Sequence, residues 1–237
     1  MNGLLIAAGE AGADRLCAGL GAHRSPVEQL RGLFRGAEVE VSWERIFAPG
    51  LLSHARIVRV TSGEGLEIAN LVAVPEPALA APVLGVELVR VREGEALVVA
   101  DLSPCVGSPL HEPLPAAPQP EGFTPLRSLP AWFERWRSPH AIAGTVAWPQ
   151  GAPSVRTCVL ACVEGFVAQV RSTVPLARGS EAEIARVDAV WRAQRDWARD
   201  HRESDRGLRL LDTIVGPERA RLFVREVMFP DPPARGR

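Results

Sequence analysis

The chain of 237 residues contains no lysine and no tyrosine, and no apolar run reaches the roughly 18 residues of a membrane span. Its opening segment, MNGLLIAAGEAGADRL, has no basic stretch and only a short apolar one, unlike a secretory signal. The 27 basic residues, all arginine, balance 28 acidic residues and form no basic stripe, which argues against nucleic acid. We therefore expect a cytoplasmic protein that binds neither membranes nor nucleic acid.

Cysteine is scarce: four residues are present, at positions 17, 105, 158 and 162, and none forms a Cys-x-x-Cys motif. This pattern excludes a disulfide framework and favours reduced thiols. A helix would place Cys158 and Cys162 on one face, where a metal pair is conceivable and small apolar packing residues are the commoner interpretation. The segment LIAAGEAGAD offers only a fragment of a dinucleotide turn and lacks Gly-x-Gly-x-x-Gly, so we reject a Rossmann fold.

The length fits a single domain spanning residues 1–237 with a substantial apolar core. A short helix is predicted at 26–36, after which the hydrophobic pattern changes to strand-like runs separated by turn residues. The predicted strands are 38–47, 55–60, 66–74, 82–92 and 95–102. Short connections between successive strands favour an antiparallel meander.

The second half of the chain has a different pattern. Prolines are dense between residues 104 and 130 and predict a long extended loop. Helical spacing follows at 154–171, 181–201 and 206–215, and Pro217 opens a last helix that stops after Phe229. An antiparallel sheet followed by helices predicts a layered α+β fold.

Two predicted central strands carry one polar residue each, Asn70 and Glu87, on an otherwise apolar face. A carboxylate in apolar surroundings costs on the order of several kcal/mol unless it is paired, hydrogen-bonded or raised in pKa. A raised pKa would make Glu87 a useful proton donor. Pairing with Arg90 or Arg92 explains Glu87 at least as well from the pattern alone.

Several segments resemble, in order and spacing, those of the ferredoxin-dependent bilin reductases. The central strands of that family are similar to GLEIANLVAVPEP, PVLGVELV and VVADLSP, including the PEP turn. Its Pro-Trp segment resembles SLPAWFERWRSPHAIAG, and its closing helices resemble ESDRGLRLLDTIVGPERARLFVREVMF. The likeness extends over residues 55–229.

The resemblance implies a three-layer α/β/α sandwich, in which a central antiparallel sheet floors a pocket for a biliverdin-like pigment and C-terminal helices roof it. It also implies that no flavin, nicotinamide or metal is bound. Single electrons would come from an external 2Fe–2S ferredoxin, and the protein would supply protons to bilin radicals. The expected partners are therefore ferredoxin and a bilin, for a chain that acts as a monomer.

The resemblance also assigns roles to individual positions. Glu87 stands where the family usually has a pocket Asp, and Asp205 matches its C-terminal pocket Asp, although an Asp beside Ser is also a favoured helix N-cap. Asn70 matches a position that is His in phycocyanobilin-forming members and Asn in the phycoerythrobilin-forming branch. Val58 stands in place of a further Glu of the first group. Glu87, Asp205 and Asn70 are the candidate catalytic residues.

Contacts to the pigment itself need cations for its propionates and apolar groups for its rings. Arg206 and Arg209 are placed to pair with propionates. Val72 and Val89 share strand faces with the two polar residues and are the candidate ring contacts. Asp101, in the segment ADLSP, is interpreted as a structural residue that organises the following turn.

The resulting hypothesis is ferredoxin-dependent reduction of biliverdin IXα or a dihydrobiliverdin to a phytobilin through bilin radicals. Two alternatives stay open. The substituted pocket positions would suit a non-catalytic tetrapyrrole-binding protein, and the same fold would suit a reductase of a chlorophyll catabolite.

Overall fold

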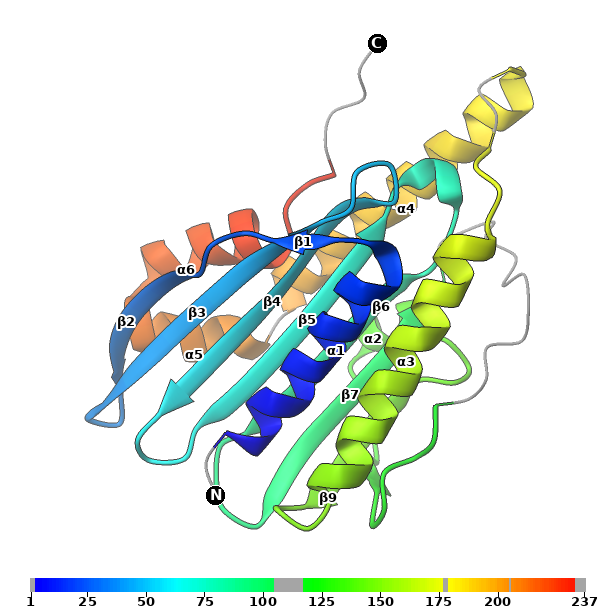
Figure 1. Cartoon of the computed structure of the whole chain (residues 1–237). Coiled ribbons are helices and arrows are strands. Elements are labelled where there is room, and N and C mark those ends of the chain that lie inside the picture. Colours follow the sequence, from blue (N-terminus) through cyan, green and yellow to red (C-terminus); the bar gives the residue numbers. More distant parts are fainter. Residues whose placement is uncertain (1–2, 105–116, 177–178, 205, 233–237) are drawn as a thin grey trace.

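The computed structural model describes residues 3–104, 117–176, 179–204 and 206–232. Its helices are α1 (Leu4–Leu20), α2 (Ala131–Trp136), α3 (Ala152–Ser172), α4 (Glu181–Ser204), α5 (Arg206–Val215) and α6 (Pro217–Phe223). A nine-stranded antiparallel sheet lies between two helical layers, with α1 and α3 on one face and α4, α5 and α6 on the other (Figure 1). The predicted α+β sandwich with a central antiparallel sheet is therefore confirmed.

The strands follow the chain order closely. They are β1 (His23–Arg24), β2 (Glu28–Phe34), β3 (Ala37–Phe47), β4 (Leu52–Ser62), β5 (Glu67–Pro75), β6 (Val83–Arg90), β7 (Glu95–Ser103), β8 (Thr124–Pro125) and β9 (Ile142–Ala147). The order across the sheet is β1-β3-β4-β5-β6-β7-β9-β8, and β2 also pairs with β3. Strands β3 to β7 form the predicted meander, and all five strands predicted from the sequence are confirmed.

The helix predicted at 26–36 is wrong, because these residues form β2 and pair with β3 along its length. Leu30, Gly32 and Phe34 are the less exposed residues of β2, which is the two-residue period of a strand. Helix α5 packs against this strand so closely that a Cβ on Gly32 would overlap the carbonyl oxygen of Ile214. Pairing with β3 and packing on α5 thus decide the conformation of a segment whose local pattern is ambiguous.

Helix α1 was not predicted, although its buried residues recur at helical spacing. No side chain within the helix caps its N-terminus. Instead, the buried carboxylate of Glu67 on β5 accepts hydrogen bonds from the backbone N–H groups of Gly3 (2.7 Å) and Leu5 (3.2 Å). The same carboxylate pairs with Arg90 of β6 at 2.5 Å. A tertiary cap from the sheet therefore replaces the usual local one.

Glycines let α1 approach both of its neighbours closely. A Cβ on Gly9 would lie 2.6 Å from the Cβ of Ala69 on β5, and a Cβ on Gly12 would lie 2.8 Å from Val159 on α3. The glycine-containing segment that suggests a fragment of a nucleotide-binding turn is therefore a packing face, which agrees with the rejection of a Rossmann fold.

The predicted helices of the last third are confirmed as α3, α4 and α5, and α6 continues into a π-helical turn, Val224–Met228. Gly216, with φ of +85°, ends α5, and Pro217 follows in the first turn of α6, as predicted. The short elements α2, β8 and β9 were not predicted. Much of the predicted proline-rich loop, residues 105–116, lies outside the described residues.

Two of the cysteines are packing residues. Cys158 and Cys162 lie in the apolar core between α3 and the sheet, and burial raises the pKa of Cys158 to about 11 and also raises that of Cys162. Within the described ranges, no group of three His, Cys, Asp or Glu residues could hold a metal ion. Likewise, none of the helices that the structure describes combines the length and apolar character needed to cross a membrane.

Candidate functional site

The sheet face beneath the C-terminal helices is covered unevenly. A buried apolar cluster joins α4, α5 and α6 to β3, β4, β5 and the start of β6, and among the described residues it includes none from β7 or β9. On this face, most residues along β6, β7 and β9 are only partly buried: Gly85, Glu87, Val89, Leu97, Val99, Ala143 and Thr145. Val83, Asp101 and Ser103, at one end of these strands, are buried. The opposite face of the same strands is packed against α1 and α3. This partly exposed half of the face is the candidate ligand surface.

The structure places the predicted polar residues Asn70 and Glu87 side by side. They are direct cross-strand partners between β5 and β6. The same row continues to Val58 on β4 and to Val99 on β7, so the two polar side chains interrupt an apolar line across the sheet. Asn70 is 7 % exposed and Glu87 is half-buried, so the row runs from the packed part of the face to its partly exposed part.

The two arginines near Glu87 in the sequence form ion pairs with other carboxylates. Arg90 lies on the opposite face of β6, where it pairs with buried Glu67. Arg92 pairs with Glu95 at the exposed end of the β6–β7 hairpin. Each of these two arginines thus has a carboxylate partner other than Glu87.

Arg56 on β4 is the main residue of this region that sequence reasoning missed. Its side chain is fully buried at 0 % exposure, and its guanidinium donates to the backbone oxygen of Asn70 (2.9 Å), to Asn70 Oδ1 (2.6 Å) and to the backbone oxygen of Met228 (3.1 Å). It also lies 5.4 Å from the ring centre of Phe229. The sequence does contain a signal that could have identified Arg56, because it interrupts an apolar strand as Glu87 does.

The other predicted site residues are less informative. Asp205 and the side chain of Arg206 lie outside the described residues. Arg209 is exposed on α5. Val72 is buried in the apolar cluster at 3 % exposure, whereas Val89 is half-buried on the candidate surface.

Asp101 lies on the same face as Glu87, opposite Gly85, and is bound by its neighbours. Its carboxylate accepts hydrogen bonds from Ser103 Oγ (3.0 Å), Ser138 Oγ (2.6 Å) and the backbone N–H of Ser138 (3.1 Å). Burial raises its pKa, and these hydrogen bonds act in the opposite direction. The contacts agree with a structural role, which here includes fastening the segment after α2 to the sheet.

An aromatic group surrounds His201 near the end of α4. The imidazole lies 3.9 Å from Trp197, 4.6 Å from Trp132 and 5.2 Å from Phe229, measured between ring centres. Burial lowers the pKa of His201 to about 4, so the ring is neutral at physiological pH. This arrangement closes the helical layer beside Arg56, and no spacing in the sequence indicated it.

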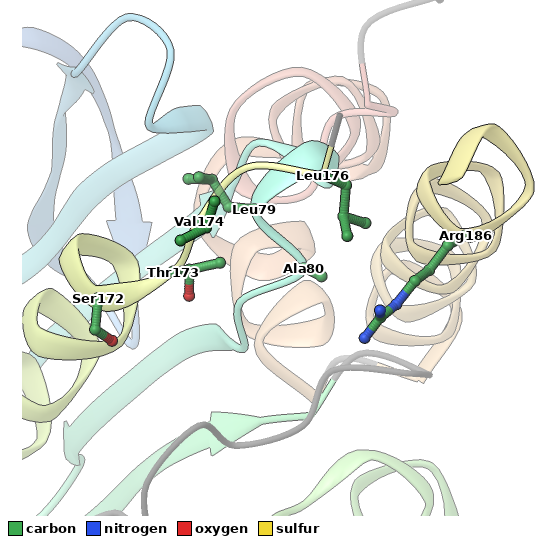
Figure 2. Close-up of a pocket in the computed structure, with 7 residues that line it drawn as sticks. All are labelled: Leu79, Ala80, Ser172, Thr173, Val174, Leu176 and Arg186. Carbon is green, nitrogen blue, oxygen red and sulfur yellow. The ribbon is translucent and has the colours of Figure 1, made fainter. Parts of the chain in front are cut away.

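A separate cavity of about 360 Å³ lies between the β5–β6 connection and the α3–α4 connection. Arg186 extends from α4 toward it, facing Ala80, Thr173 and Leu176 (Figure 2). Among the described residues, those that line this cavity include none of the predicted site residues and no carboxylate. It is therefore distinct from the Asn70–Glu87 surface.

Comparison with known proteins agrees with the geometry. Residues 27–230 match the family model described as ferredoxin-dependent bilin reductase. The chain is 25 % identical over 219 residues to a phycocyanobilin:ferredoxin oxidoreductase of Prochlorococcus marinus (strain MIT 9303), covering 88 % of this chain and 78 % of that protein. The enzyme of the same name from strain MIT 9313 is also 25 % identical, with the same coverage.

The fold has a solved counterpart. A crystal structure of tomato phytochromobilin synthase in complex with biliverdin superposes with a TM-score of 0.74 over 93 % of this chain and 80 % of that one, at 14 % sequence identity. At that identity the likeness establishes the fold alone. Together with a family match that spans most of the sequence, it leads to one conclusion: the chain belongs to the ferredoxin-dependent bilin reductase family, whose members are oxidoreductases.

Proposed function

We propose that this chain reduces a biliverdin-like open-chain tetrapyrrole with electrons from ferredoxin. The observation that carries the proposal is the adjacent pair Asn70 and Glu87 on a partly exposed sheet face, in a chain of the bilin reductase family. A flat conjugated pigment has the shape to cover such a face. That the tomato enzyme of the same fold was solved with biliverdin supports this choice of substrate class.

In the proposed reaction, a 2Fe–2S ferredoxin gives one electron to the bilin and is itself oxidised, and a proton then adds to the resulting radical. Two such rounds convert a conjugated double bond into a CH–CH bond, with two electrons and two protons consumed. Glu87 is the proposed donor of a proton, because a half-buried carboxyl group can contact the pigment and still be reprotonated from water. Asp205 is the proposed second donor.

The remaining predicted residues would hold the pigment. Arg206 and Arg209 of α5 are proposed to pair with propionates, because guanidinium groups bind carboxylates with paired hydrogen bonds. Val89 is proposed to contact the pyrrole rings directly, and buried Val72 to support the floor beneath them. No bound cofactor takes part in this scheme. We also propose that residues 1–237 form one domain that acts as a monomer, which light scattering coupled to size exclusion would test.

The product need not be that of the phycocyanobilin-forming relatives. Glu87 in place of Asp extends the acid by one methylene, a displacement of more than about 1 Å, which is enough to change which carbon receives a proton. Asn70 and Val58 depart from the phycocyanobilin-forming pattern as well. We propose that the product is the one made by the phycoerythrobilin-forming branch of the family, and chromatographic comparison with authentic bilins would identify it.

The deciding experiment is anaerobic incubation of the chain with biliverdin IXα, ferredoxin and a ferredoxin-reducing system. Wild type should convert the pigment, whereas Glu87→Gln should bind it and stall at a radical or early intermediate. Glu164→Gln, on α3 over the opposite face of the sheet, is the matched control and should turn over normally, because Glu164 is exposed and pairs only with exposed Arg15 among the ion pairs of the described residues. Binding without any ferredoxin-driven spectral change would instead identify a tetrapyrrole carrier, and activity only on a chlorophyll catabolite would identify the other alternative.

A further inference from the structure

The buried guanidinium of Arg56 fixes the orientation of the Asn70 side chain. A guanidinium carries only hydrogen-bond donors, so the atom of the carboxamide that faces it must be the oxygen. The 2.6 Å contact from Arg56 Nη1 to Asn70 Oδ1 satisfies this requirement. Bonds to the backbone oxygens of Asn70 and Met228 hold the guanidinium itself in place. The amide nitrogen of Asn70 must therefore point away from Arg56.

The consequence is that Asn70 presents N–H donors on the candidate surface. Within the described part of the chain, no acceptor is bound to the Asn70 amide nitrogen, and this nitrogen is not among the buried polar atoms that lack a partner. The residue lies directly across from Glu87. A neutral bilin offers two kinds of acceptor to such a donor, the lactam carbonyl oxygens and an unprotonated ring nitrogen.

We infer that Asn70 binds the bilin as a hydrogen-bond donor to a lactam oxygen or an unprotonated ring nitrogen, and that Arg56 is the positioning residue that sets this polarity. This inference rests on the proposed function and makes it more specific. An amide cannot release a proton, so in this arrangement Asn70 aligns the pigment and Glu87 supplies the proton. The positive charge on Arg56 also polarises the amide and strengthens its N–H donors.

The isosteric variant Asn70→Asp separates this role from a structural one. The introduced carboxylate keeps an oxygen for Arg56 and gains an ion pair with it, so the fold and its thermal midpoint should be retained. The variant loses both N–H donors and faces the bilin with an acceptor, so biliverdin affinity should fall by roughly 10- to 100-fold. Asn70→Asp should also shift the absorption of bound biliverdin. Arg56→Lys, which keeps the positive charge and loses the planar guanidinium group, should shift that absorption in the same direction by a smaller amount.

Affinity, absorption spectrum and turnover should be measured on wild type and both variants. Equal biliverdin affinity in wild type and Asn70→Asp would overturn the donor role alone, and an unshifted spectrum in Arg56→Lys would overturn the positioning role. If wild type binds biliverdin without turnover, the proposed reductase activity is refuted, and the affinities of wild type and Asn70→Asp alone decide whether Asn70 is a donor. Wild type that fails to bind would overturn both.

A second site lies where the C-terminal segment crosses β4 and α4. A small cavity there leaves about 10 Å³ within which the centre of a water molecule can lie. It is lined by His54, Gln194, Trp197 and the segment from Met228 to Pro230. Three of its polar atoms are buried and have no hydrogen-bond partner in the part of the chain that the structure describes: His54 Nε2, Gln194 Oε1 and Trp197 Nε1. The space is about that of one water molecule.

The chemistry of these three atoms is that of a water site. Trp197 Nε1 can only donate. Gln194 donates through Nε2 to the backbone oxygen of Pro75 at 2.9 Å, so its free Oε1 is an acceptor. Burial lowers the pKa of His54 to about 3, so the ring is neutral, and its buried Nε2 can serve as the lone-pair atom of that ring.

We propose that one ordered water molecule occupies this cavity, accepts from Trp197 and donates to Gln194 and His54. It would join β4, α4 and the C-terminal segment through a single three-way bridge. This site is independent of the proposed catalysis.

A high-resolution crystal structure should show a water within hydrogen-bond distance of all three atoms, and ¹⁵N shifts should report a neutral His54 protonated on Nδ1. Trp197→Phe removes the N–H donor together with part of a buried ring, so a lower thermal midpoint is expected from the lost packing alone, and the order of the water is the readout that tests the donor. A dry site in crystals that show buried water elsewhere, or a His54 protonated on Nε2, would overturn the proposal.

Discussion

Removing Glu67 from its buried pair with Arg90 is expected to destabilise the fold strongly, because it leaves buried donors and a buried charge without a partner. Oε1 of Glu67 accepts from Gly3 N–H and from Arg90, and Oε2 accepts from Leu5 N–H. The side chains of the pair are 3 % and 8 % exposed. In Glu67→Gln the negative charge is lost and one oxygen becomes an N–H₂ group, so at least one of these donors faces another donor.

The magnitude follows from burial. Removing one partner of a buried ion pair costs about 3–5 kcal/mol, because the other charge stays desolvated. We expect about 3 kcal/mol for Glu67→Gln, since the amide keeps one acceptor oxygen. For a domain of this size that loss lowers Tm by roughly 6–12 °C. The damage should concentrate in α1, whose first turn loses its cap.

The matched control is Glu95→Gln. Glu95 forms the same type of pair, with Arg92, but the two side chains are 44 % and 80 % exposed, and water replaces the lost contact. Urea unfolding followed by circular dichroism measures both variants, and amide hydrogen exchange locates the loss. The double variant Glu67→Gln with Arg90→Gln should cost less than the sum of the single changes. If Glu67→Gln unfolds at the same urea concentration as Glu95→Gln, loss of the cap and the ion pair does not lower the free energy of unfolding by the expected amount of about 3 kcal/mol.

Three further predictions concern other parts of the fold. Gly9→Val should lower Tm, because even a Cβ there would lie 2.6 Å from a side-chain carbon of β5. His54 and His201 have folded pKa values of about 3 and about 4, below the ordinary value of about 6.5, so the unfolded chain binds their protons first. Stability should therefore fall as pH drops below about 6.5, and His201→Gln should show a shallower pH dependence of Tm. Iodoacetamide under native conditions should leave Cys158 and Cys162 unmodified by peptide mass spectrometry, whereas labelling of either would contradict their place in the core.

Helix α1 shows what a local pattern cannot supply. Its apolar residues have helical spacing, but glycines at positions 9 and 12 lower its intrinsic helix propensity, and no side chain within it caps the first turn. What compensates is non-local: Glu67 caps it from 62 residues away, and the glycines are tolerated because they admit β5 and α3. The central strands were predictable, by contrast, because alternation and turn residues are properties of the local sequence.

The same contrast runs through the candidate site. Glu87 and Asn70 could be singled out as polar interruptions of apolar strands that follow one another in the chain, and antiparallel pairing of β5 with β6 makes them direct neighbours. Arg56 interrupts an apolar strand in the same way, yet an arginine in a strand is most often at the surface. Its complete burial depends on the backbone oxygen of Met228, 172 residues further along the chain. A rule based on strand alternation therefore finds residues whose partners are adjacent strands and misses those held by the opposite layer.

The exposure of the key side chains increases across three neighbouring strands, and this gradient fits the different roles proposed for them. Arg56 on β4 is fully buried, Asn70 on β5 is 7 % exposed, and Glu87 on β6 is half-buried. A charge that only orients a neighbour benefits from burial, because water cannot compete for its hydrogen bonds. A group that must lose and regain a proton in each round needs contact with water. Exchanging the two environments would give an acid that cannot be reprotonated and an arginine that no longer fixes Asn70, so the order of these residues across the sheet is itself part of the proposed mechanism.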